Sequence, residues 1–327
     1  MHTDPKSLRI VYMGTPDFAV APLRALVEGG YNVVTVVTMP DKPAGRGLKM
    51  QESAVKRYAK EVGLPVMQPE KLKSEEFAAA LRELDPDLGI VVAFKMLPET
   101  VFSLPRYGTF NLHASLLPQY RGAAPINWAI INGETETGVT TFMLNPRMDE
   151  GAVIDRRVVS IDGDDNVGTL HDKLMVTGAG LVTESVGKIV SEGFVPQPQP
   201  AVAASELRPA PKIFKETCHL DFENSGRDII NLIRGLSPYP GAWVSMKECV
   251  GVETVRESQM KIYAARFEPA DTSAVRCGDG FVSDGVLRIA CRDGYVLPDT
   301  VQPAGKQRLG VREYLNGLKH KECLRFR

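Results

Sequence analysis

Three polar side chains in this chain have the types and spacing for acyl-transfer chemistry. Asn111 and His113 stand two residues apart in a stretch that suits a strand, so both side chains leave the same face. Asp149 follows the next apolar stretch, in a loop that can lie beside them. An amide and an imidazolium can donate hydrogen bonds to an oxyanion, and a neighbouring carboxylate favours the charged ring. The alternative is that all three are ordinary loop, core and turn residues.

Other chemistries fit the sequence less well. Ser115 has no G-x-S-x-G turn around it, which argues against a serine hydrolase. The first strand runs into Gly14-Thr15-Pro16-Asp17 instead of G-x-G-x-x-G, and an acidic residue there would oppose a pyrophosphate. The five cysteines form no C-x-x-C pair, and no His or carboxylate pair has metal-ligand spacing. The sequence therefore predicts neither a dinucleotide cofactor nor a metal, and it favours a reducing cytoplasm.

The elements that must position these residues read as an α/β sheet. Apolar runs at 8–13 and 31–37 flank a helical stretch, which predicts a β-α-β unit with parallel strands. The run at 87–94 is nearly all apolar, as in a buried parallel strand. Further strands are expected at 138–144 and 153–161, and a long helix at 167–190. Open sheets of this kind place their ligand sites where strands end in loops.

A chain of 327 residues is long enough for two domains. We expect a Rossmann-like, mostly parallel catalytic domain over 1–194 and a proline-rich linker over 195–211. Short strands separated by turn signals then predict a small β-barrel domain over 212–327.

Charge is distributed unevenly between the two halves. Residues 208–327 carry 19 Lys and Arg against 15 Asp and Glu, although the whole chain has a net charge of −1. The loop at 38–52 contains Lys42, Arg46 and Lys49 beside two glycines and a proline. It is either a solvated connection or a mobile basic finger for an anionic partner. No apolar run approaches the ~20 residues that span a bilayer, so no membrane partner is expected.

Stretches along nearly the whole chain resemble the methionyl-tRNA formyltransferase family. The matching stretches are Gly14-Thr15-Pro16-Asp17-Phe18, 40–47, 111–118, 120–125, Met148-Asp149-Glu150-Gly151, 210–213, 236–243 and 303–306. The 111–118 block is typical of enzymes that use formyltetrahydrofolate, and the basic loop with the second domain singles out the tRNA enzyme among them.

The resemblance implies transfer of the formyl group of 10-formyltetrahydrofolate to the amino group of methionyl initiator tRNA, by a monomer that binds folate and charged tRNA. It implies that Asn111 and His113 stabilise the oxyanion, while Asp149 orients and charges His113 and helps move protons. The implied folate loop is Ser115, Leu116, Leu117 and Pro118, alongside residues 94–97. The implied tRNA contacts are Lys42, Arg46, Lys49 and Lys212, the last in a domain similar to a five-stranded oligonucleotide-binding barrel.

Two alternatives to this function stay open. One is a folate-dependent formyltransferase that acts on a small amine, such as a sugar nucleotide or glycinamide ribonucleotide. The other is a non-catalytic RNA-binding protein that keeps a degenerate folate site.

The chain departs from the family pattern at two positions. Lys95 stands where the family has glycine, so we expect a strained backbone there. Glu150 stands where threonine is commoner, which adds a negative charge beside Asp149.

Overall fold

The computed structural model describes residues 4–44, 49–250, 253–318, 321 and 324–327. The chain forms two compact units, each assembled from three stretches of sequence. The first comprises residues 1–125, 136–160 and 171–209, and the second comprises residues 126–135, 161–170 and 210–327. The domain boundaries expected at 194/195 and 211/212 stay a prediction.

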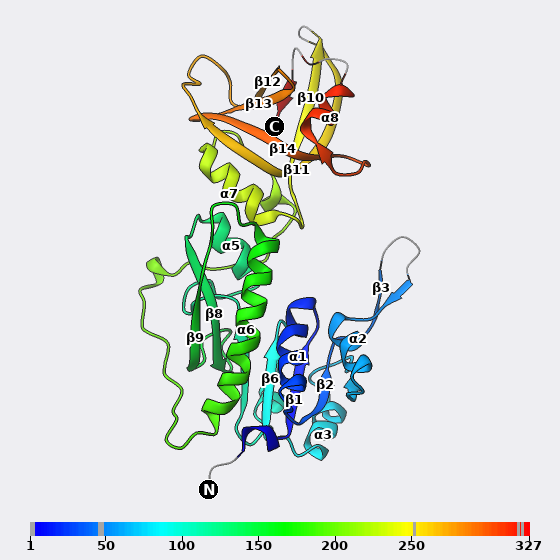
Figure 1. The fold of residues 1–327 in the computed structure, drawn as a ribbon, viewed down its shortest axis with the longest axis vertical. Helices are drawn as coiled ribbons and strands as arrows, with labels where there is room; N and C mark the ends of the chain where they lie inside the picture. Colours follow the sequence, from blue (N-terminus) through cyan, green and yellow to red (C-terminus); the bar gives the residue numbers. More distant parts are fainter. Residues whose placement is uncertain (1–3, 45–48, 251–252, 319–320, 322–323) are drawn as a thin grey trace. The chain divides into compact units, whose positions relative to one another are not determined.

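A seven-stranded sheet forms the centre of the first unit (Figure 1). Its order is β5-β2-β1-β6-β7-β8-β9, with the first five strands parallel and the last two antiparallel, so the predicted mostly parallel sheet is confirmed. The strands are β1 (Ile10–Gly14), β2 (Val33–Val37), β5 (Val66–Met67), β6 (Leu88–Val92), β7 (Thr109–His113), β8 (Glu136–Met143) and β9 (Val153–Ser160).

Helices pack on this sheet because its central strands are apolar on both faces. Every residue of β1 and β6 is buried. On one face Val11 and Val91 pack with side chains of α3 and α4, including Phe77 and Val101. Helices of this unit are α1 (Val20–Glu28), α2 (Ala54–Glu61), α3 (Glu75–Glu83) and α4 (Glu99–Phe102), and α6 (Val167–Ile189) confirms the predicted long helix.

Serine side chains cap several helices and thereby define where they begin. Ser53 accepts a hydrogen bond from the Lys56 amide at the start of α2, and Ser74 accepts one from the Phe77 amide at the start of α3. A serine in the extended conformation satisfies an amide that has no partner inside the helix. The local sequence therefore determines where α2 and α3 begin.

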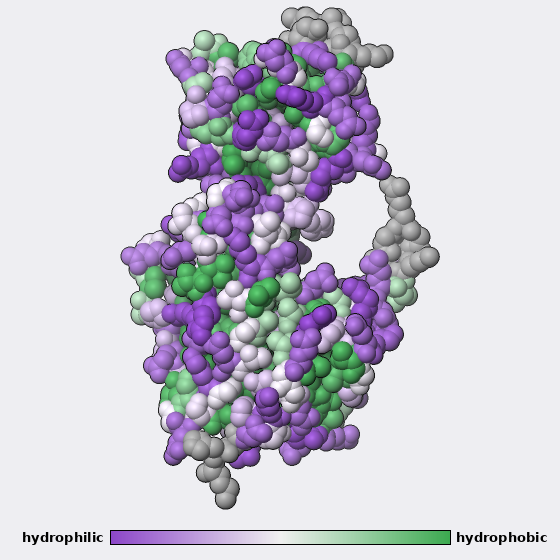
Figure 2. Space-filling view, viewed as in Figure 1, coloured by the Kyte–Doolittle hydropathy of each residue, from purple (hydrophilic) through white to green (hydrophobic). Residues whose placement is uncertain are grey.

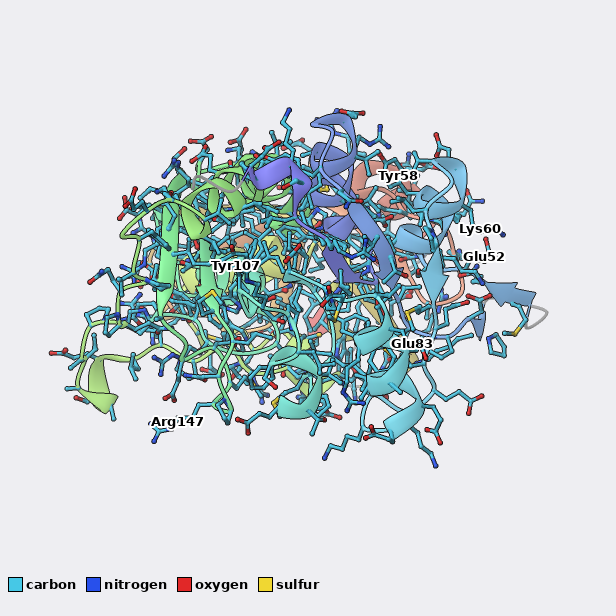
Figure 3. The ribbon with its side chains drawn as sticks, turned by 90° about the horizontal axis from the view of Figure 1, so that it is seen from below. Glu52, Tyr58, Lys60, Glu83, Tyr107 and Arg147 are labelled. Carbon is cyan, nitrogen blue, oxygen red and sulfur yellow. The ribbon has the colours of Figure 1, made fainter. Side chains whose placement is uncertain are left out.

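The basic stretch at 38–52, which we expected to be a loop, contains two paired strands that form the sides of a β-hairpin. Strands β3 (Lys42–Ala44) and β4 (Lys49–Gln51) pair antiparallel. At the base of the hairpin, the carboxylate of Asp41 accepts hydrogen bonds from Lys56 Nζ at 2.6 Å and from Gln68 Nε2 at 2.8 Å. Glu52 pairs with Lys60 at 2.8 Å on the other side, and Figure 3 shows these two side chains together.

The second unit is built around an antiparallel barrel. Strands β11, β10, β16, β12, β13 and β14 form a ring, closed by pairing of β14 with β11, so six strands replace the five implied by the family resemblance. Its elements are α5 (Pro125–Ile131), α7 (Gly226–Leu236), β10 (Ala242–Val250), β11 (Glu253–Pro269), β12 (Asp279–Ser283), β13 (Val286–Cys291), β14 (Gly294–Pro303), β15 (Leu309–Gly310), α8 (Val311–Asn316) and β16 (Leu324–Phe326). Leu287, Ile289 and Val301 fill the barrel with Ile229 and Ile233 of α7.

The surface outside these two cores carries both hydrophilic and hydrophobic residues. On the face drawn in Figure 2, hydrophobic residues form small separate patches among hydrophilic ones. Among the described residues, none of the helices has the length and apolar character needed to cross a membrane.

Candidate active site

Strand β7 carries Asn111 and His113 on one face of the first unit's sheet. Asn111 is paired with Val91 of β6 and with Phe142 of β8, while His113 is paired with Thr140 of β8. The intervening Leu112 faces the other way, because a β-carbon added at Gly178 of α6 would lie 2.7 Å from the Leu112 side chain. The predicted same-face arrangement of the amide and the imidazole therefore follows from the pleat of the strand.

The Asn111 amide is available to a ligand. The residue is partly buried, and its side chain has no hydrogen-bond partner within the part of the chain that the structure describes. An amide nitrogen offers two donor hydrogens. This side chain is suited to donate to an oxygen that enters the site.

His113 is held by a backbone carbonyl. Its side chain is buried, and Nε2 lies 2.9 Å from the carbonyl oxygen of Tyr120. A carbonyl only accepts hydrogen bonds, so Nε2 carries a hydrogen in this contact. The second ring nitrogen, Nδ1, is then the atom that can exchange a proton.

Asp149 is held by the same turn that holds His113. Its Oδ2 accepts a hydrogen bond from the Gly122 amide at 2.9 Å. Tyr120, Gly122 and Asp149 all have positive φ, at 59°, 126° and 55°. Among the described residues, no hydrogen bond joins the Asp149 and His113 side chains directly, and the turn at 120–122 links them. The orienting role of Asp149 stays a prediction.

The Asp149 loop leaves no room for a side chain at residue 151. A β-carbon there would overlap the carbonyl group of Met143 on β8. Gly151 is therefore required for the chain to turn back from β8 into β9 while it presents Asp149. The glycine of the Met-Asp-Glu-Gly stretch is thus explained by close backbone packing.

Gln199, which sequence reasoning did not single out, clamps this loop. Its Nε2 donates to the carbonyl oxygens of Asp149 at 2.8 Å and Gly151 at 3.0 Å, and its Oε1 accepts from Arg121 at 2.7 Å. The residue lies 50 positions beyond Asp149, inside a stretch that reads only as a proline-rich connection. Nothing in its local sequence indicates this contact.

The same proline-rich stretch also supports the turn at 120. The Tyr120 amide donates to the carbonyl of Arg208 at 2.7 Å, and the Arg208 amide donates to Gln119 Oε1 at 2.8 Å. Residues 197–208 thus form hydrogen bonds with several other segments of the first unit. This segment therefore supports the turn at Tyr120 and the loop that carries Asp149.

Two arginines compensate the extra charge of Glu150. Its carboxylate lies 3.3 Å from Arg121 and 3.6 Å from Arg147. The Arg147 side chain is 80% exposed and extends outward in Figure 3. The negative charge of Glu150 is therefore paired with the positive charges of Arg121 and Arg147.

The expected folate loop is a buried turn. Ser115, Leu117 and Pro118 are buried, whereas Leu116 is partly exposed. Thr140 ties the turn together, because its Oγ1 donates to the Ser115 carbonyl at 2.6 Å and accepts from the Leu117 amide at 3.2 Å. The loop can shape a pocket wall, although these two backbone groups are already engaged.

The prediction of a strained backbone at Lys95 is wrong. Lys95 is not among the non-glycine residues with positive φ, whereas Ala93, two residues earlier, has a φ of 47°. The left-handed position lies at the end of β6, and a lysine side chain can follow it without conformational cost. Lys95 is exposed.

The expected tRNA contacts lie on two separate stretches. Lys42 on β3 is exposed, and Lys49 begins β4. Arg46 lies outside the described residues. Lys212 is exposed, and its Nζ lies 5.6 Å from the centre of the Phe214 ring. Among the described residues, no cluster of three or more His, Cys, Asp or Glu side chains could hold a metal ion.

Known families and proteins match this chain over nearly its whole length. Residues 8–185 match the family model described as formyl transferase, and residues 212–319 match the formyl transferase C-terminal domain. The chain is 54% identical over 317 residues to the methionyl-tRNA formyltransferase of Parabacteroides distasonis, covering 96% of this chain and 97% of the relative. It is 55% identical to that of Bacteroides thetaiotaomicron, with the same coverage of both chains.

Solved structures of lower identity share the fold. WlaRD, a sugar 3N-formyl transferase solved with dTDP and 5-N-formyl-THF, superposes with a TM-score of 0.63 at 18% identity over 92% of this chain and 99% of its own. HypX from Aquifex aeolicus, solved in complex with tetrahydrofolic acid, gives 0.61 at 18% identity over 94% of this chain and 47% of its own.

Proposed function

The chain belongs to the methionyl-tRNA formyltransferase family, and from this premise we propose how its residues carry out the reaction. The enzyme transfers the formyl group of 10-formyltetrahydrofolate to the amino group of methionyl initiator tRNA, which gives formylmethionyl-tRNA for translation initiation. The observation that carries the residue assignment is the Asn111 amide beside His113 at the end of β7, with no partner of its own among the described residues.

Asn111 and His113 act on the oxygen of the formyl group. When the amine nitrogen bonds to the formyl carbon, negative charge develops on that oxygen. Donors already in position stabilise this charge more than they stabilise the uncharged carbonyl, and this difference lowers the barrier. The amine itself is the nucleophile, so no serine or cysteine is needed.

His113 and Asp149 account for the protons. The attacking amine must lose a proton and the departing folate nitrogen must gain one. His113 holds a hydrogen on Nε2 against Tyr120, so its Nδ1 is the site for proton exchange. Asp149, held by the Gly122 amide, places a carboxylate in the same loop region, where it can take part in the proton transfers.

The residues present suit a folate co-substrate. Asn111 supplies a donor for a formyl oxygen, and the turn at 115–118 with partly exposed Leu116 supplies an apolar wall. Bound folates in WlaRD and HypX, which share the fold, support the same ligand class here. We assign Ser115, Leu116, Leu117 and Pro118 to this wall.

Basic residues on both units are assigned to the tRNA. Lys42 and Lys49 belong to strands β3 and β4 of the first unit, Arg46 lies between them in sequence, and Lys212 belongs to the second unit. Phosphates attract such residues irrespective of base sequence. We propose that the enzyme works as a monomer in the cytoplasm, and sedimentation of the free protein tests the monomer.

A formylation assay with competing acceptors tests the function. Charged initiator tRNA, a sugar nucleotide amine and glycinamide ribonucleotide are offered separately with 10-formyltetrahydrofolate. We expect kcat/KM to be highest for the tRNA. A higher value for either small amine would contradict the assignment of tRNA as the acceptor.

A further inference from the structure

Arg156 on β9 is partly buried, and its charge is unpaired within the part of the chain that the structure describes. Among the described residues, its enclosed Nε makes no hydrogen bond, and no carboxylate forms an ion pair with the guanidinium. Burial lowers the pKa of this guanidinium below its usual value. An arginine that loses water normally gains a carboxylate or a phosphate in exchange, because an unpaired charge away from water is costly. The side chain is therefore suited to an anion that comes from outside the chain.

The register of the sheet places Arg156 on the same face as His113. His113 on β7 pairs with Thr140 on β8, and Thr140 pairs with Arg156 on β9. Directly opposed residues of neighbouring strands have their side chains on one face, and strands are about 4.8 Å apart, so the backbones of His113 and Arg156 are separated by roughly 10 Å. The next residue, Arg157, lies on the other face, where it pairs with Glu184 of α6.

The turn at 115–118, which we assigned to the folate, lies against this same face of β8. Thr140 holds the turn through its Oγ1 by two hydrogen bonds, of 2.6 and 3.2 Å. Gly138 shares the face with Thr140, and a β-carbon added there would lie 2.5 Å from the Leu116 side chain. Arg156 is thus the neighbour, on β9, of the residue that holds this turn.

The charged end of a folate suits this position better than a phosphate of the tRNA does. Beyond the nitrogen that carries the formyl group, a folate has a benzoyl ring and then a glutamate with two carboxylates. A formyl group at His113 therefore leaves the glutamate at a distance from that residue, toward the edge of the site. The basic strands β3 and β4 follow β2, and β2 and β9 lie on opposite sides of β7 in the sheet (Figure 1).

We propose that Arg156 binds a carboxylate of the glutamate moiety of the folate co-substrate. The planar guanidinium can donate two parallel hydrogen bonds to a carboxylate, and such charge-assisted pairs are stronger than hydrogen bonds between neutral groups. The proposal rests on the proposed function for the identity of the co-substrate. It adds a charged contact to the apolar wall assigned to residues 115–118.

Binding of tetrahydrofolate to the full-length protein tests this contact without catalysis. Calorimetric titrations compare tetrahydrofolate with tetrahydropteroyl methylamide, which has a methyl group in place of the glutamate and so lacks both carboxylates. We expect Arg156→Gln to raise Kd for tetrahydrofolate about tenfold and to leave Kd for the methylamide unchanged. Arg156→Lys, which keeps the charge but loses the planar fork, should give a Kd between those of wild type and Arg156→Gln.

Arg157→Gln is the matched control, because it removes the neighbouring arginine on the other face of β9. Arg157 is already paired with Asp155 and Glu184, so its loss should leave both Kd values unchanged. The melting temperature of Arg156→Gln should equal or exceed that of wild type, because the variant removes an unpaired and partly buried charge. A lower melting temperature with weaker binding of both ligands would assign Arg156 to the fold and overturn the proposal.

Measurements with tRNA separate this proposal from the proposed function. Arg156→Gln should leave Kd for tRNA unchanged in filter binding, and a loss of tRNA affinity with an unchanged Kd for tetrahydrofolate would overturn the proposal in favour of a phosphate site. If the wild-type enzyme formylates tRNA and Arg156→Gln binds tetrahydrofolate as wild type does, the proposal fails while the function stands. If the wild-type enzyme prefers a small amine, the function fails, and the tetrahydrofolate titrations still decide the proposal. Absence of tetrahydrofolate binding by the wild type would overturn both.

Discussion

Nε2 of His113 lies 2.9 Å from the carbonyl oxygen of Tyr120, and this contact determines which ring nitrogen is left for chemistry. Tyr120 holds a φ of 59° in the same turn whose Gly122 amide binds Asp149 at 2.9 Å. One short turn thus positions both the imidazole and the carboxylate. The site depends on the backbone of residues 120–122 as much as on its polar side chains.

Removal of the Asn111 amide should abolish most of the activity without loss of tRNA binding. Because the amide donates to the developing oxyanion, Asn111→Ala is expected to lower kcat about 100- to 1,000-fold. His113→Ala should have a comparable effect. His171→Ala is the control, since that ring contacts Phe18 on the first unit and should change kcat little. Single-turnover formylation and tRNA filter binding measure the two quantities, and activity that survives both site variants would refute the assignment.

Two variants of Asp149 separate its charge from its hydrogen bond. Asn can still accept from the Gly122 amide and tolerates positive φ, so Asp149→Asn should fold with near wild-type stability but lose kcat. Asp149→Ala removes the acceptor as well and should also lower the free energy of unfolding by about 1–3 kcal/mol. Urea unfolding and kcat are measured for both. Equal kcat for Asp149→Asn and wild type would show that the charge is not used.

Gln199→Leu should release the Asp149 loop. The substitution keeps the size of the side chain but removes the partner of two carbonyls and of Arg121 Nη2, while Arg121 keeps its ion pair with Glu150, at a cost of about 1–3 kcal/mol in the site. As a positioning residue, Gln199 should affect kcat and its pH profile more than KM for folate. Gln197→Leu is the control, because that side chain bonds only Val195 within the same stretch among the described residues. An identical pH profile and kcat in Gln199→Leu would assign the clamp to stability alone.

Lys42→Gln should weaken tRNA binding through electrostatics. Loss of one phosphate contact reduces the slope of log Kd against log salt by about one, with little dependence on tRNA sequence. Lys6→Gln is the control for a general loss of positive charge, because Lys6 lies near the N-terminus and outside the stretch 38–52. Kd is measured by filter binding between low and high salt. Arg46→Ala is expected to behave like Lys42→Gln and to lower kcat/KM for tRNA.

Acid should loosen the base of the hairpin. The hydrogen bond from Lys56, with that from Gln68, holds the pKa of Asp41 below its usual value. A folded-state pKa that is depressed stabilises the fold above the unfolded pKa of about 3.9, and this stabilisation is lost as the pH falls through the folded pKa. Asp41→Asn should therefore be less stable than wild type at pH 7 and should converge with it below pH 4. Thermal unfolding across pH 3–7 measures the difference, and a constant gap would rule out this origin.

Local patterns in the sequence determined the elements and the chemistry that they offer. The alternation along 109–113 placed Asn111 and His113 on one face, and serine caps marked the starts of α2 and α3. Apolar runs predicted the buried parallel strands, and turn signals predicted the barrel. These features depend on residues within a few positions of each other, so one sequence suffices to read them.

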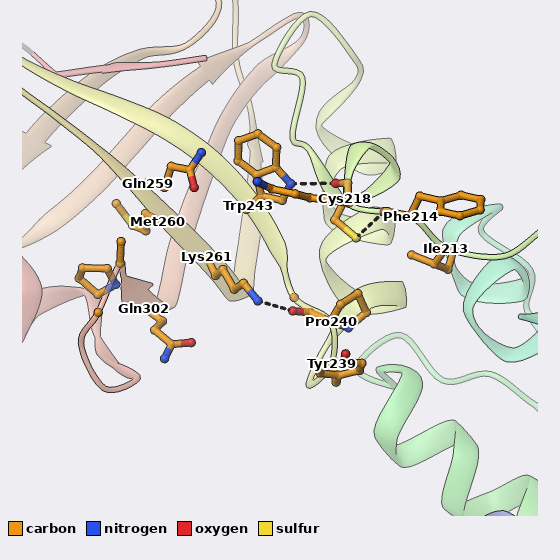
Figure 4. A pocket seen from close by; sticks show the side chains of 15 residues that line it. Ile213, Phe214, Cys218, Tyr239, Pro240, Trp243, Gln259, Met260, Lys261 and Gln302 are labelled. Carbon is orange, nitrogen blue, oxygen red and sulfur yellow. Dashed lines mark hydrogen bonds between the residues drawn. The ribbon is translucent and has the colours of Figure 1, made fainter. Parts of the chain in front are cut away.

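The tertiary structure decided what holds those residues in place. Gln199 reaches back 50 positions to the Asp149 loop, and Tyr120 offers a backbone carbonyl that any residue type would possess. The barrel closes with six strands because β14 pairs with β11, which no local pattern encodes. A groove of the barrel unit combines residues from stretches near 214, 240, 260 and 303 (Figure 4). Such contacts arise only when distant segments pack together, because backbone groups carry no residue-specific signal and long-range pairs leave no period in a single sequence.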